Sequence, residues 1–414
     1  MKPLKIGFIG SGFIAHFLAK AMVQVRHCEL TAIYRRSGAD TLAAYAKSEG
    51  LGEPVLCDRI KDLVEKVDAV AIFSPNFTRL SVMEEVVDAV KKGASLTGVI
   101  CEKPLGRTIR EATRMVELAR EAKLKTSYFE NQLHMSVITH ALDQLQPQQE
   151  AMGPITLARS TEEHAGPHSS WFWDPEKQGG GVLSDMGCHS IAACKYILTP
   201  VGKPLDYLKP VSVQAETSLL KWGQPVFRKQ LKERYGVDYE KRPSEDFASG
   251  IFTFEHPDSG MRVKGQFTDS WMYDKQGLRL SMDGLGPGYA MEVNTLISPL
   301  EIFIGDEAAE GAADAETALE KSTATRGLMA VHPNEADLYG YVTELKDAVD
   351  AFREGRDAKL SFEFGLEVTR LVQAAYMAAE KGITLDLTDS ATQTELESYQ
   401  SAISKGEGAD LLLS

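Results

Sequence analysis

The sequence predicts an α/β fold in which an N-terminal, doubly wound parallel domain is followed by a second domain built on antiparallel strands. Strand and helix patterns alternate from the amino terminus to about residue 130, which is typical of βαβ units. Past Pro147, apolar and polar residues alternate with period two, which indicates antiparallel strands with one covered face. We therefore place the first domain at residues 1–130, the second at 131–390 and a polar tail at 391–414.

Length and composition fit two domains and exclude some classes of partner. The chain has 414 residues with 43% hydrophobic content, and about 100–200 residues per domain are usual. The formal net charge of −14 argues against a nucleic-acid partner, because such binding relies on clustered Lys and Arg. No apolar run approaches the roughly 18 residues that span a bilayer, and the Met1-Lys2-Pro3 start lacks a cleavage site. We expect a cytoplasmic protein without membrane contact, in which five scattered cysteines stay reduced.

A glycine turn after the first strand predicts a dinucleotide site. Residues 4–9 read as a buried strand, and an apolar helical run ends near Val25. The segment between them, Gly10-Ser11-Gly12-Phe13-Ile14-Ala15, is the G-x-G-x-x-G/A pattern in its required context. Gly10 permits the tight turn, Gly12 lets the backbone approach a pyrophosphate, and the helix N-terminus attracts the phosphates. We expect the cofactor to contact Gly10, Gly12, Phe13 and Ile14.

The end of the second predicted strand, residues 30–34, bears on the choice of cofactor. An NAD-preferring domain usually places Asp or Glu here to accept hydrogen bonds from the ribose 2′-OH. This chain has Arg35-Arg36 instead, and two guanidiniums can pair with a 2′-phosphate. The sequence therefore favours NADP among the NAD(P) cofactors, with a solvated basic turn as the alternative.

The remaining pattern of the first domain continues the βαβ rhythm. We expect further strands at residues 54–56, 68–73, 99–100 and 125–129, and helices at residues 40–49, 80–92 and 109–122. The fourth strand ends in Ser74-Pro75-Asn76, where the chain must leave the sheet. Those three residues should border the cofactor.

The segment Cys101-Glu102-Lys103-Pro104 places a cation at a strand end. Pro104 has no N–H to donate to a ladder, so the chain must turn at Lys103. In an open α/β sheet, ligands bind outside the carboxyl ends of the strands, so Lys103 should face the bound ligand. An exposed Lys-Pro loop is the alternative for these residues taken alone.

The second domain has its own pattern of strands, inserts and helices. Alternating segments predict strands at residues 155–160, 211–215, 250–254 and 261–267, and helical spacing predicts helices at residues 335–353 and 364–381. Charged, turn-rich inserts interrupt the strands at residues 228–246 and 306–320, and we expect the second insert to be a solvated surface excursion.

A glycine-rich run, Gly179-Gly180-Gly181, leads into a candidate catalytic pair. On a helix that begins near these glycines, Asp185 and His189 stand at i and i+4 and project from one face. A carboxylate that orients an imidazole is the usual arrangement of a general base. A surface ion pair is the alternative reading.

Taken together, the glycine turn, Ser74-Pro75-Asn76, Glu102-Lys103-Pro104 and the run that ends in Asp185 and His189 resemble the Gfo/Idh/MocA family of glucose-fructose oxidoreductase and inositol dehydrogenase relatives. The resemblance covers about residues 1–390. It implies a Rossmann domain followed by an α/β domain with a large open, mainly antiparallel sheet, through which such proteins form homo-oligomers, here a dimer or tetramer.

The resemblance also implies roles for single residues. Lys103 corresponds to the lysine that binds nicotinamide and the substrate hydroxyl, and His189 to the acid/base with Asp185 beside it; Glu102 belongs to the cofactor edge. Two departures exist. Arg79 stands where the family commonly has a histidine, and the link before Cys101 is longer than usual. Because of these two departures, the family pattern does not determine how the residues that border the cofactor are arranged.

The segment between residues 160 and 190 should shape the substrate pocket. It contains His164, His168 and Trp173 but no arginine to clamp a carboxylate, which favours a pyranose or cyclitol over a linear hydroxy acid. The alternative is that Arg159 or a residue of the charged insert at 228–246 supplies that cation. A tryptophan that anchors the core or an interface is the alternative for Trp173. The histidines with His189 could also hold a transition metal, but their spacing matches no standard motif and we expect no metal.

We therefore expect an NAD(P)-dependent oxidoreductase that acts on a secondary alcohol of a sugar, glycoside or cyclitol. One rival is an enzyme that oxidises a glycoside only transiently with retained nicotinamide, so that elimination or hydrolysis follows. The other is a non-catalytic NAD(P) sensor or scaffold, which has no need of Lys103, Asp185 and His189 together.

Overall fold

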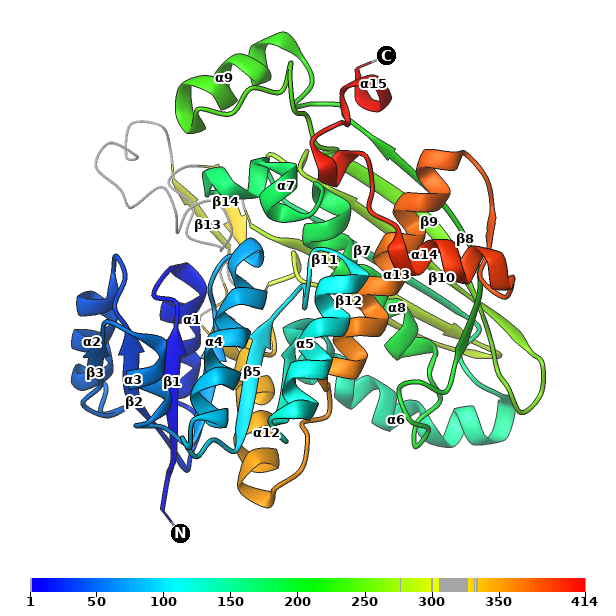
Figure 1. Ribbon diagram of the computed structural model, residues 1–414. Coiled ribbons are helices and arrows are strands. Elements are labelled where there is room, and N and C mark those ends of the chain that lie inside the picture. Colours follow the sequence, from blue (N-terminus) through cyan, green and yellow to red (C-terminus); the bar gives the residue numbers. More distant parts are fainter. Residues whose placement is uncertain are drawn as a thin grey trace. The chain divides into compact units, whose positions relative to one another are not determined.

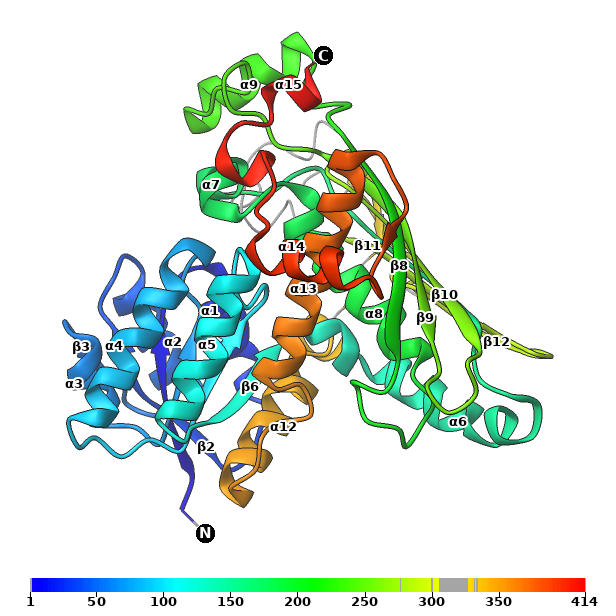
Figure 2. The same ribbon diagram turned by 45° about the vertical axis from the view of Figure 1, so that its right-hand side comes forward.

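The computed structural model describes residues 2–275, 277–298, 301–304, 327–330, 332 and 334–413, so the expected insert at 306–320 lies outside the described residues. The chain divides into two compact units (Figures 1 and 2). Unit 1 comprises Met1–Ser136 and Ala336–Thr369, and unit 2 comprises Val137–Glu335 and Arg370–Ser414.

Unit 1 contains a six-stranded parallel sheet in the order β3-β2-β1-β4-β5-β6, the doubly wound order of a Rossmann fold. Its strands are β1 (Leu4–Ile9), β2 (Cys28–Tyr34), β3 (Val55–Cys57), β4 (Ala69–Ile72), β5 (Gly98–Glu102) and β6 (Lys125–Phe129). The central strands β4 and β5 are buried throughout, as strands covered on both faces must be. The predicted fold class of this unit is confirmed.

Helices cover both faces of this sheet. They are α1 (Phe13–Met22), α2 (Ala39–Ser48), α3 (Ile60–Val64), α4 (Arg79–Lys91), α5 (Ile109–Glu121) and α12 (Tyr341–Glu354), with short 3₁₀ turns η1 (Asn76–Thr78) and η2 (Asn131–His134). Helix α4 packs between α3 and α5, and Figure 1 shows α4 and α5 in front of the sheet. Helix α1 packs against α2 and α12, with the rings of Phe17 and Tyr341 4.7 Å apart.

Helix α12 belongs to unit 1, although about 200 residues of unit 2 separate it in sequence from the rest of that unit. The predicted helix at 335–353 is divided into two helices, α11 (Glu335–Leu338) and α12. Gly340 lies between them with φ 83°, a left-handed conformation that interrupts a right-handed helix. The ring of Phe352 fills the space above Gly98, where an added Cβ would lie 2.7 Å from it. Chain order alone would have assigned this helix to the second domain.

Unit 2 is built on a seven-stranded sheet in the order β12-β11-β7-β10-β9-β8-β15. Its strands are β7 (Leu157–Glu163), β8 (Lys209–Ser218), β9 (Phe247–Glu255), β10 (Arg262–Ser270), β11 (Arg279–Gly286), β12 (Tyr289–Asn294) and β15 (Leu385–Asp386); β13 (Glu301–Ile304) and β14 (Gly327–Ala330) form a separate pair. The sheet is mainly antiparallel, as predicted. The exception is the pair formed by β7 and β10, which is parallel.

Helix α8 (Cys188–Leu198) covers one face of this sheet and is buried along its whole length. It packs against β7, β10 and β11, and Figure 2 shows it beside the long strands. Gly265 on β10 permits this close packing, because a Cβ there would lie 2.9 Å from the Cβ of Cys194. The alternation of the strands leaves their opposite face more exposed, with Ile251 45% exposed.

The other elements of unit 2 surround these layers. They are α6 (Ser136–Met152), η3 (Ser170–Trp173), α7 (Pro175–Gln178), η4 (Leu183–Gly187), α9 (Pro225–Tyr235), α13 (Phe362–Lys381, which begins in unit 1), α14 (Ser390–Ser398), η6 (Ile403–Lys405) and α15 (Ala409–Leu412). The insert predicted as charged and turn-rich at 228–246 is partly helical, since α9 runs into it and ends at Gly236 with φ 69°.

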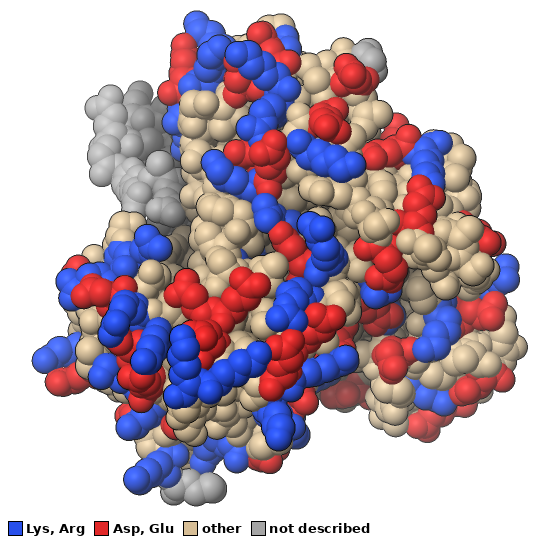
Figure 3. Space-filling model, viewed as in Figure 1, with Lys and Arg blue, Asp and Glu red and all other residues tan. Residues whose placement is uncertain are grey.

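The surface carries charges of both signs. On the face shown in Figure 3, Lys and Arg side chains are interspersed with Asp and Glu. Among the described helices, none is both long enough and apolar enough to cross a membrane.

Candidate functional site

The glycine turn between β1 and α1 has one tightly packed glycine and one open glycine. Gly10 has φ 127°, and a Cβ there would lie 2.7 Å from the carbonyl carbon of Phe73. Gly12 is the N-cap of α1, and a Cβ there would meet no atom of the described residues within 4 Å. Packing therefore requires the first glycine, whereas the second leaves space in which a phosphate group could approach the helix N-terminus.

The arginines after β2 lie beside this turn. The hydroxyl of Ser11 donates to the carbonyl of Ser37 at 2.9 Å, which ties the turn to the loop that follows the arginines. Arg35 is about half exposed and its Nε lies 3.1 Å from Asp58. Arg36 covers the ring of Tyr34 at 5.2 Å. Both arginines therefore follow the carboxyl end of β2, and Arg35 is paired with Asp58, which the sequence analysis did not consider.

Arg79 at the start of α4 connects two loops at the carboxyl ends of the strands. Its guanidinium is buried and donates to the carbonyls of Ser74 at 3.1 Å and Glu102 at 2.7 Å, and also to that of Pro104. The loop after β4 and the loop that carries Lys103 are thus held by one side chain. Sequence analysis noted Arg79 only as a departure from a family pattern; a charged residue at a helix start, just after Ser74-Pro75-Asn76, was the available signal.

Lys103 follows β5 directly. The strand extends to Glu102, two residues beyond the predicted end, and the Lys103–Pro104 peptide is cis. The backbone N–H of Lys103 donates to Oε2 of Glu102 at 3.2 Å, and the Lys103 side chain is only half-buried. Ligands of Rossmann domains bind at the carboxyl ends of the strands, and the partly exposed Lys103 lies at such an end.

A buried carboxyl on α12 lies near this strand end. Glu344 is 1% exposed, and among the described residues neither of its carboxyl oxygens has a hydrogen-bond partner. Burial raises its pKa well above the ordinary value, and the neighbouring carboxylates of Glu102 and Glu130 raise it further. The sequence analysis missed Glu344; its position on the apolar face of α12, between Tyr341 and Leu345, was the signal.

In unit 2, the glycine run is fixed by Glu245 and Tyr376. Oε1 of Glu245 accepts hydrogen bonds from the N–H groups of Gly181 at 3.0 Å and Leu183 at 3.1 Å. A Cβ at Gly180 would lie 2.0 Å from the Tyr376 hydroxyl, and one at Gly181 would lie 2.2 Å from the Glu245 carbonyl oxygen. The glycines are therefore required by packing against two side chains distant in sequence. Burial is the main reason that the pKa of Glu245 is raised to about 7.

Asp185 and His189 follow this anchored segment. Asp185 lies in η4, which is a π-helical turn, and His189 lies in the first turn of α8; both side chains are buried. The helix predicted to begin near the glycines does run through both residues, but its first part is a π-turn, which is wider than the α-helix that follows. Next to His189, the hydroxyl of Ser190 donates to Asp269 at 2.6 Å and fixes the start of α8 to β10.

The aromatic and histidine residues at 164–173 have separate environments. Nδ1 of His164 accepts the N–H of Gly166 at 2.9 Å, and the ring of His168 lies 5.9 Å from that of Phe172. Trp173 is buried and its indole N–H donates to Pro167 at 3.0 Å. In the described part of the chain, His164, His168 and His189 do not converge as a set of metal ligands.

Each unit thus gathers part of the predicted site. Unit 1 brings the glycine turn, the loop after β4 and Lys103 to the carboxyl edge of one parallel sheet. Unit 2 places Asp185 and His189 on one anchored turn and helix.

Comparison with known proteins gives matches in both units. The oxidoreductase family with an NAD-binding Rossmann fold, GFO_IDH_MocA, matches residues 4–130, and the GFO/IDH/MocA C-terminal domain matches residues 147–285. D-glucoside 3-dehydrogenase of Escherichia coli (strain K12) is 30% identical over 207 residues, which are 47% of this chain and 54% of that protein. 1,5-anhydro-D-fructose reductase of Ensifer adhaerens is 26% identical over 193 residues, which are 46% of this chain and 56% of that protein. The matches thus span only about half the length of these two relatives.

Solved structures share the fold over nearly the whole chain. GenD2 from gentamicin A biosynthesis, in complex with NAD, has a TM-score of 0.72 at 21% identity and covers 94% of this chain and 97% of its own. A putative myo-inositol dehydrogenase from Sinorhizobium meliloti 1021 has a TM-score of 0.67 at 19% identity, with 93% and 99% covered. With both of its domains matched, the chain belongs to the Gfo/Idh/MocA oxidoreductase family.

Proposed function

We propose that this protein is an NAD(P)-dependent oxidoreductase that transfers a hydride between nicotinamide and a secondary alcohol of a sugar, glycoside or cyclitol. The proposal rests mainly on the contrast between Gly10, which packing requires, and Gly12, whose added Cβ would meet none of the described residues within 4 Å at a helix N-terminus. Backbone N–H groups with space before them suit a pyrophosphate. The family membership supports the same reaction class.

The residues that would hold the dinucleotide lie in unit 1. Gly10, Gly12, Phe13 and Ile14 would bind the pyrophosphate, and Ser74, Pro75, Asn76, Glu102 and Lys103 would border the nicotinamide. Arg35 and Arg36 support NADP over NAD, because guanidiniums pair with a 2′-phosphate. The nicotinamide, when bound, supplies the hydride acceptor or donor.

The chain's own residues would move the proton and hold the substrate oxygen. In the oxidising direction, an imidazole nitrogen of His189 accepts the hydroxyl proton, and the carboxylate of Asp185 orients the ring. The ammonium of Lys103 binds the same oxygen and stabilises its developing negative charge. Histidine suits the base role because its reference pKa of about 6.5 lies near neutral pH.

The substrate class rests on the relatives' names and on side-chain chemistry. D-glucoside 3-dehydrogenase and 1,5-anhydro-D-fructose reductase are named for sugar substrates. His164, His168, Asp185 and His189 offer donors and acceptors for ring hydroxyls, as a polyol needs. A cytoplasmic location and a homo-oligomer, dimer or tetramer, formed through the more exposed sheet face complete the proposal, and light scattering of the purified protein tests the oligomer.

A substrate panel tests the reaction. Purified protein is incubated with NAD or NADP and with hexoses, methyl glycosides, inositols, and 2- and 3-hydroxy acids, while absorbance at the reduced-nicotinamide band is followed. We expect activity with pyranosides or cyclitols. Activity confined to the hydroxy acids would refute the substrate class. Conversion of a glycoside without accumulation of reduced nicotinamide would instead favour transient oxidation, and nucleotide binding without any conversion would favour a sensor.

A further inference from the structure

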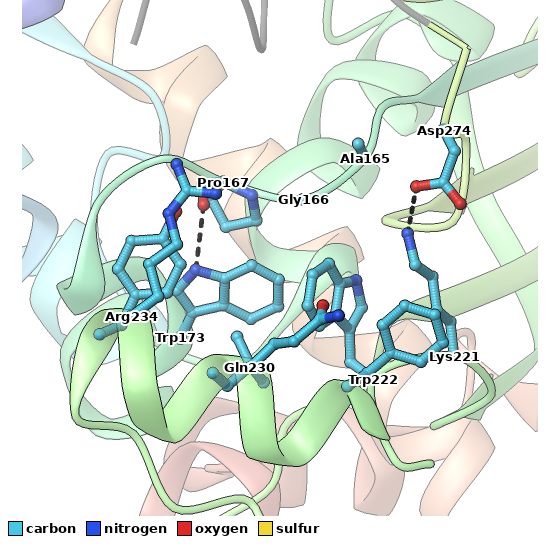
Figure 4. A pocket seen from close by; sticks show the side chains of 12 residues that line it. Ala165, Gly166, Pro167, Trp173, Lys221, Trp222, Gln230, Arg234 and Asp274 are labelled. Atoms are coloured by element: carbon cyan, nitrogen blue, oxygen red, sulfur yellow. Dashed lines mark hydrogen bonds and ion pairs between the residues drawn. The ribbon is translucent and has the colours of Figure 1, made fainter. Parts of the chain in front are cut away.

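A cavity of about 220 Å³ lies within unit 2, apart from the residues assigned above to catalysis (Figure 4). We propose that it is a carbohydrate-binding site that accepts one pyranose ring. Its lining includes Trp173, Lys221, Trp222 and Asp274. Neither Asp185 nor His189 lines it.

The insert between β8 and β9 forms one side of the cavity. Seven lining residues belong to it, and five of these lie on α9: Phe227, Gln230, Leu231, Arg234 and Tyr235. Figure 4 shows Gln230 and Arg234 extending from the helix toward the tryptophans. Leu231 is the buried anchor of α9, whereas Gln230 and Arg234 are exposed. The helix therefore presents polar side chains at the rim of the cavity.

The aromatic side chains present ring surface rather than polar atoms. The indole N–H of Trp173 is bonded to Pro167 at 3.0 Å and that of Trp222 to the carbonyl of Trp271 at 2.8 Å. The rings of Trp173 and Trp222 lie 4.7 Å apart in an edge arrangement, and Trp173 stacks with Tyr235 at 6.1 Å. Because its N–H group is already bonded, the half-buried Trp222 offers apolar ring surface of the kind that covers a sugar ring face, and the buried ring of Trp173 packs against it.

Lys221 and Asp274 add a paired donor and acceptor. The Lys221 side chain is 9% exposed and bonds to Asp274, whose side chain is 70% exposed. The ammonium also lies 4.7 Å from the ring of Trp222 and 5.2 Å from that of Phe227. An ammonium has three N–H donors, of which one is directed to Asp274. A cavity with polar donors and acceptors beside aromatic rings suits a pyranose, which has both hydroxyls and an apolar face. It suits a wholly apolar ligand less well.

The volume of the cavity limits the size of ligand that it can accept. The volume lies below the roughly 300–1,000 Å³ of pockets for drug-sized ligands, so the cavity suits one ring rather than two. Core packing alone accounts for Trp173, which is 1% exposed, but not for Trp222, Gln230 and Arg234, which remain accessible around the cavity.

Calorimetric titration of the full chain without nucleotide tests the site. The probes are methyl β-D-glucopyranoside, methyl β-D-galactopyranoside and myo-inositol, with cyclohexanol as an apolar ring. We expect at least one pyranoside to bind and Trp222→Ala to weaken it by on the order of tenfold. Gln230→Ala and Arg234→Ala, on the exposed side of α9, should weaken it about three- to tenfold without affecting folding. Lys229→Ala, on the same helix but outside the cavity lining, is the matched control and should bind normally.

His189→Ala separates this site from catalysis. Pyranoside binding that persists in His189→Ala and is weakened by the α9 variants supports the cavity, whatever the outcome of the activity panel. Three outcomes would overturn the proposal: no pyranoside binds, cyclohexanol binds while the sugars do not, or binding is lost in His189→Ala and unchanged in Trp222→Ala and Arg234→Ala.

Discussion

The hydroxyl of Tyr376 donates a 2.5 Å hydrogen bond to Oε1 of Glu245, the same oxygen that accepts the N–H groups of Gly181 and Leu183. One buried carboxyl thereby joins α13 to the backbone that leads into Asp185. Burial disfavours its charged form and raises its pKa from 4.5 to about 7, although the three donors act in the opposite direction.

Glu245→Gln should remove a pH-dependent component of stability. A carboxyl whose pKa is raised on folding stabilises the folded state fully below the unfolded pKa, and this contribution is lost as pH rises through about 7. The wild type should therefore lose on the order of 3 kcal/mol, relative to Glu245→Gln, between pH 4.5 and 8. Urea unfolding at both pH values measures this difference. Glu233→Gln, on the exposed side of α9, is the control, and an equal difference between wild type and Glu245→Gln at both pH values would contradict the assignment.

Arg35→Ala should selectively weaken NADP. The guanidinium would pair with the 2′-phosphate, so its loss should cost on the order of 1–3 kcal/mol of NADP binding, while NAD is little affected. The ratio of kcat/KM for the two cofactors measures the effect. Asp58→Ala, which frees Arg35 from its ion pair, should shift the ratio further toward NADP. Arg26→Ala serves as an exposed control; equal use of NAD by the wild type, unchanged in Arg35→Ala, would show that the arginines do not select the cofactor.

Lys103→Ala and His189→Ala should each lower turnover by a factor on the order of 10²–10⁴ while the nucleotide still binds. Both substitutions leave the glycine turn intact, so nucleotide affinity measured by titration should change little. Lys91→Ala and His140→Ala are exposed controls in the same two units. Near-normal turnover of His189→Ala across the pH range would mean that another group is the base.

Arg79→Ala should destabilise unit 1 and disturb the loop that carries Lys103. Removing the guanidinium leaves the carbonyls of Ser74, Glu102 and Pro104 without this donor, at a cost on the order of 2–4 kcal/mol in the free energy of unfolding. Arg79→Lys cannot contact all three carbonyls because an ammonium lacks the planar fork, so it should rescue folding only in part. Thermal and urea unfolding, together with kcat and KM, check this. An exposed arginine variant, Arg59→Ala, provides the comparison; full activity and stability in Arg79→Ala would contradict the proposed link between the two loops.

By itself the sequence determined the parallel sheet of unit 1, the glycine turn and the general alternation of unit 2. These features depend on local rules: period-two and helical spacing, the freedom of Gly10 at φ 127°, and the missing N–H of Pro104. Each can be recognised within a few residues of chain. The same local chemistry carried the motifs that identified the family.

Only the tertiary structure decided which distant residues meet. Glu245 and Tyr376 are 131 residues apart, α12 joins unit 1 from the far end of the chain, and β7 pairs in parallel with β10. The role of Arg79 and the cavity beneath α9 depend likewise on loops brought together by packing. Such contacts leave no periodic trace, because the free energy that selects them comes from burying surfaces and satisfying buried polar groups between elements whose separation in sequence is arbitrary.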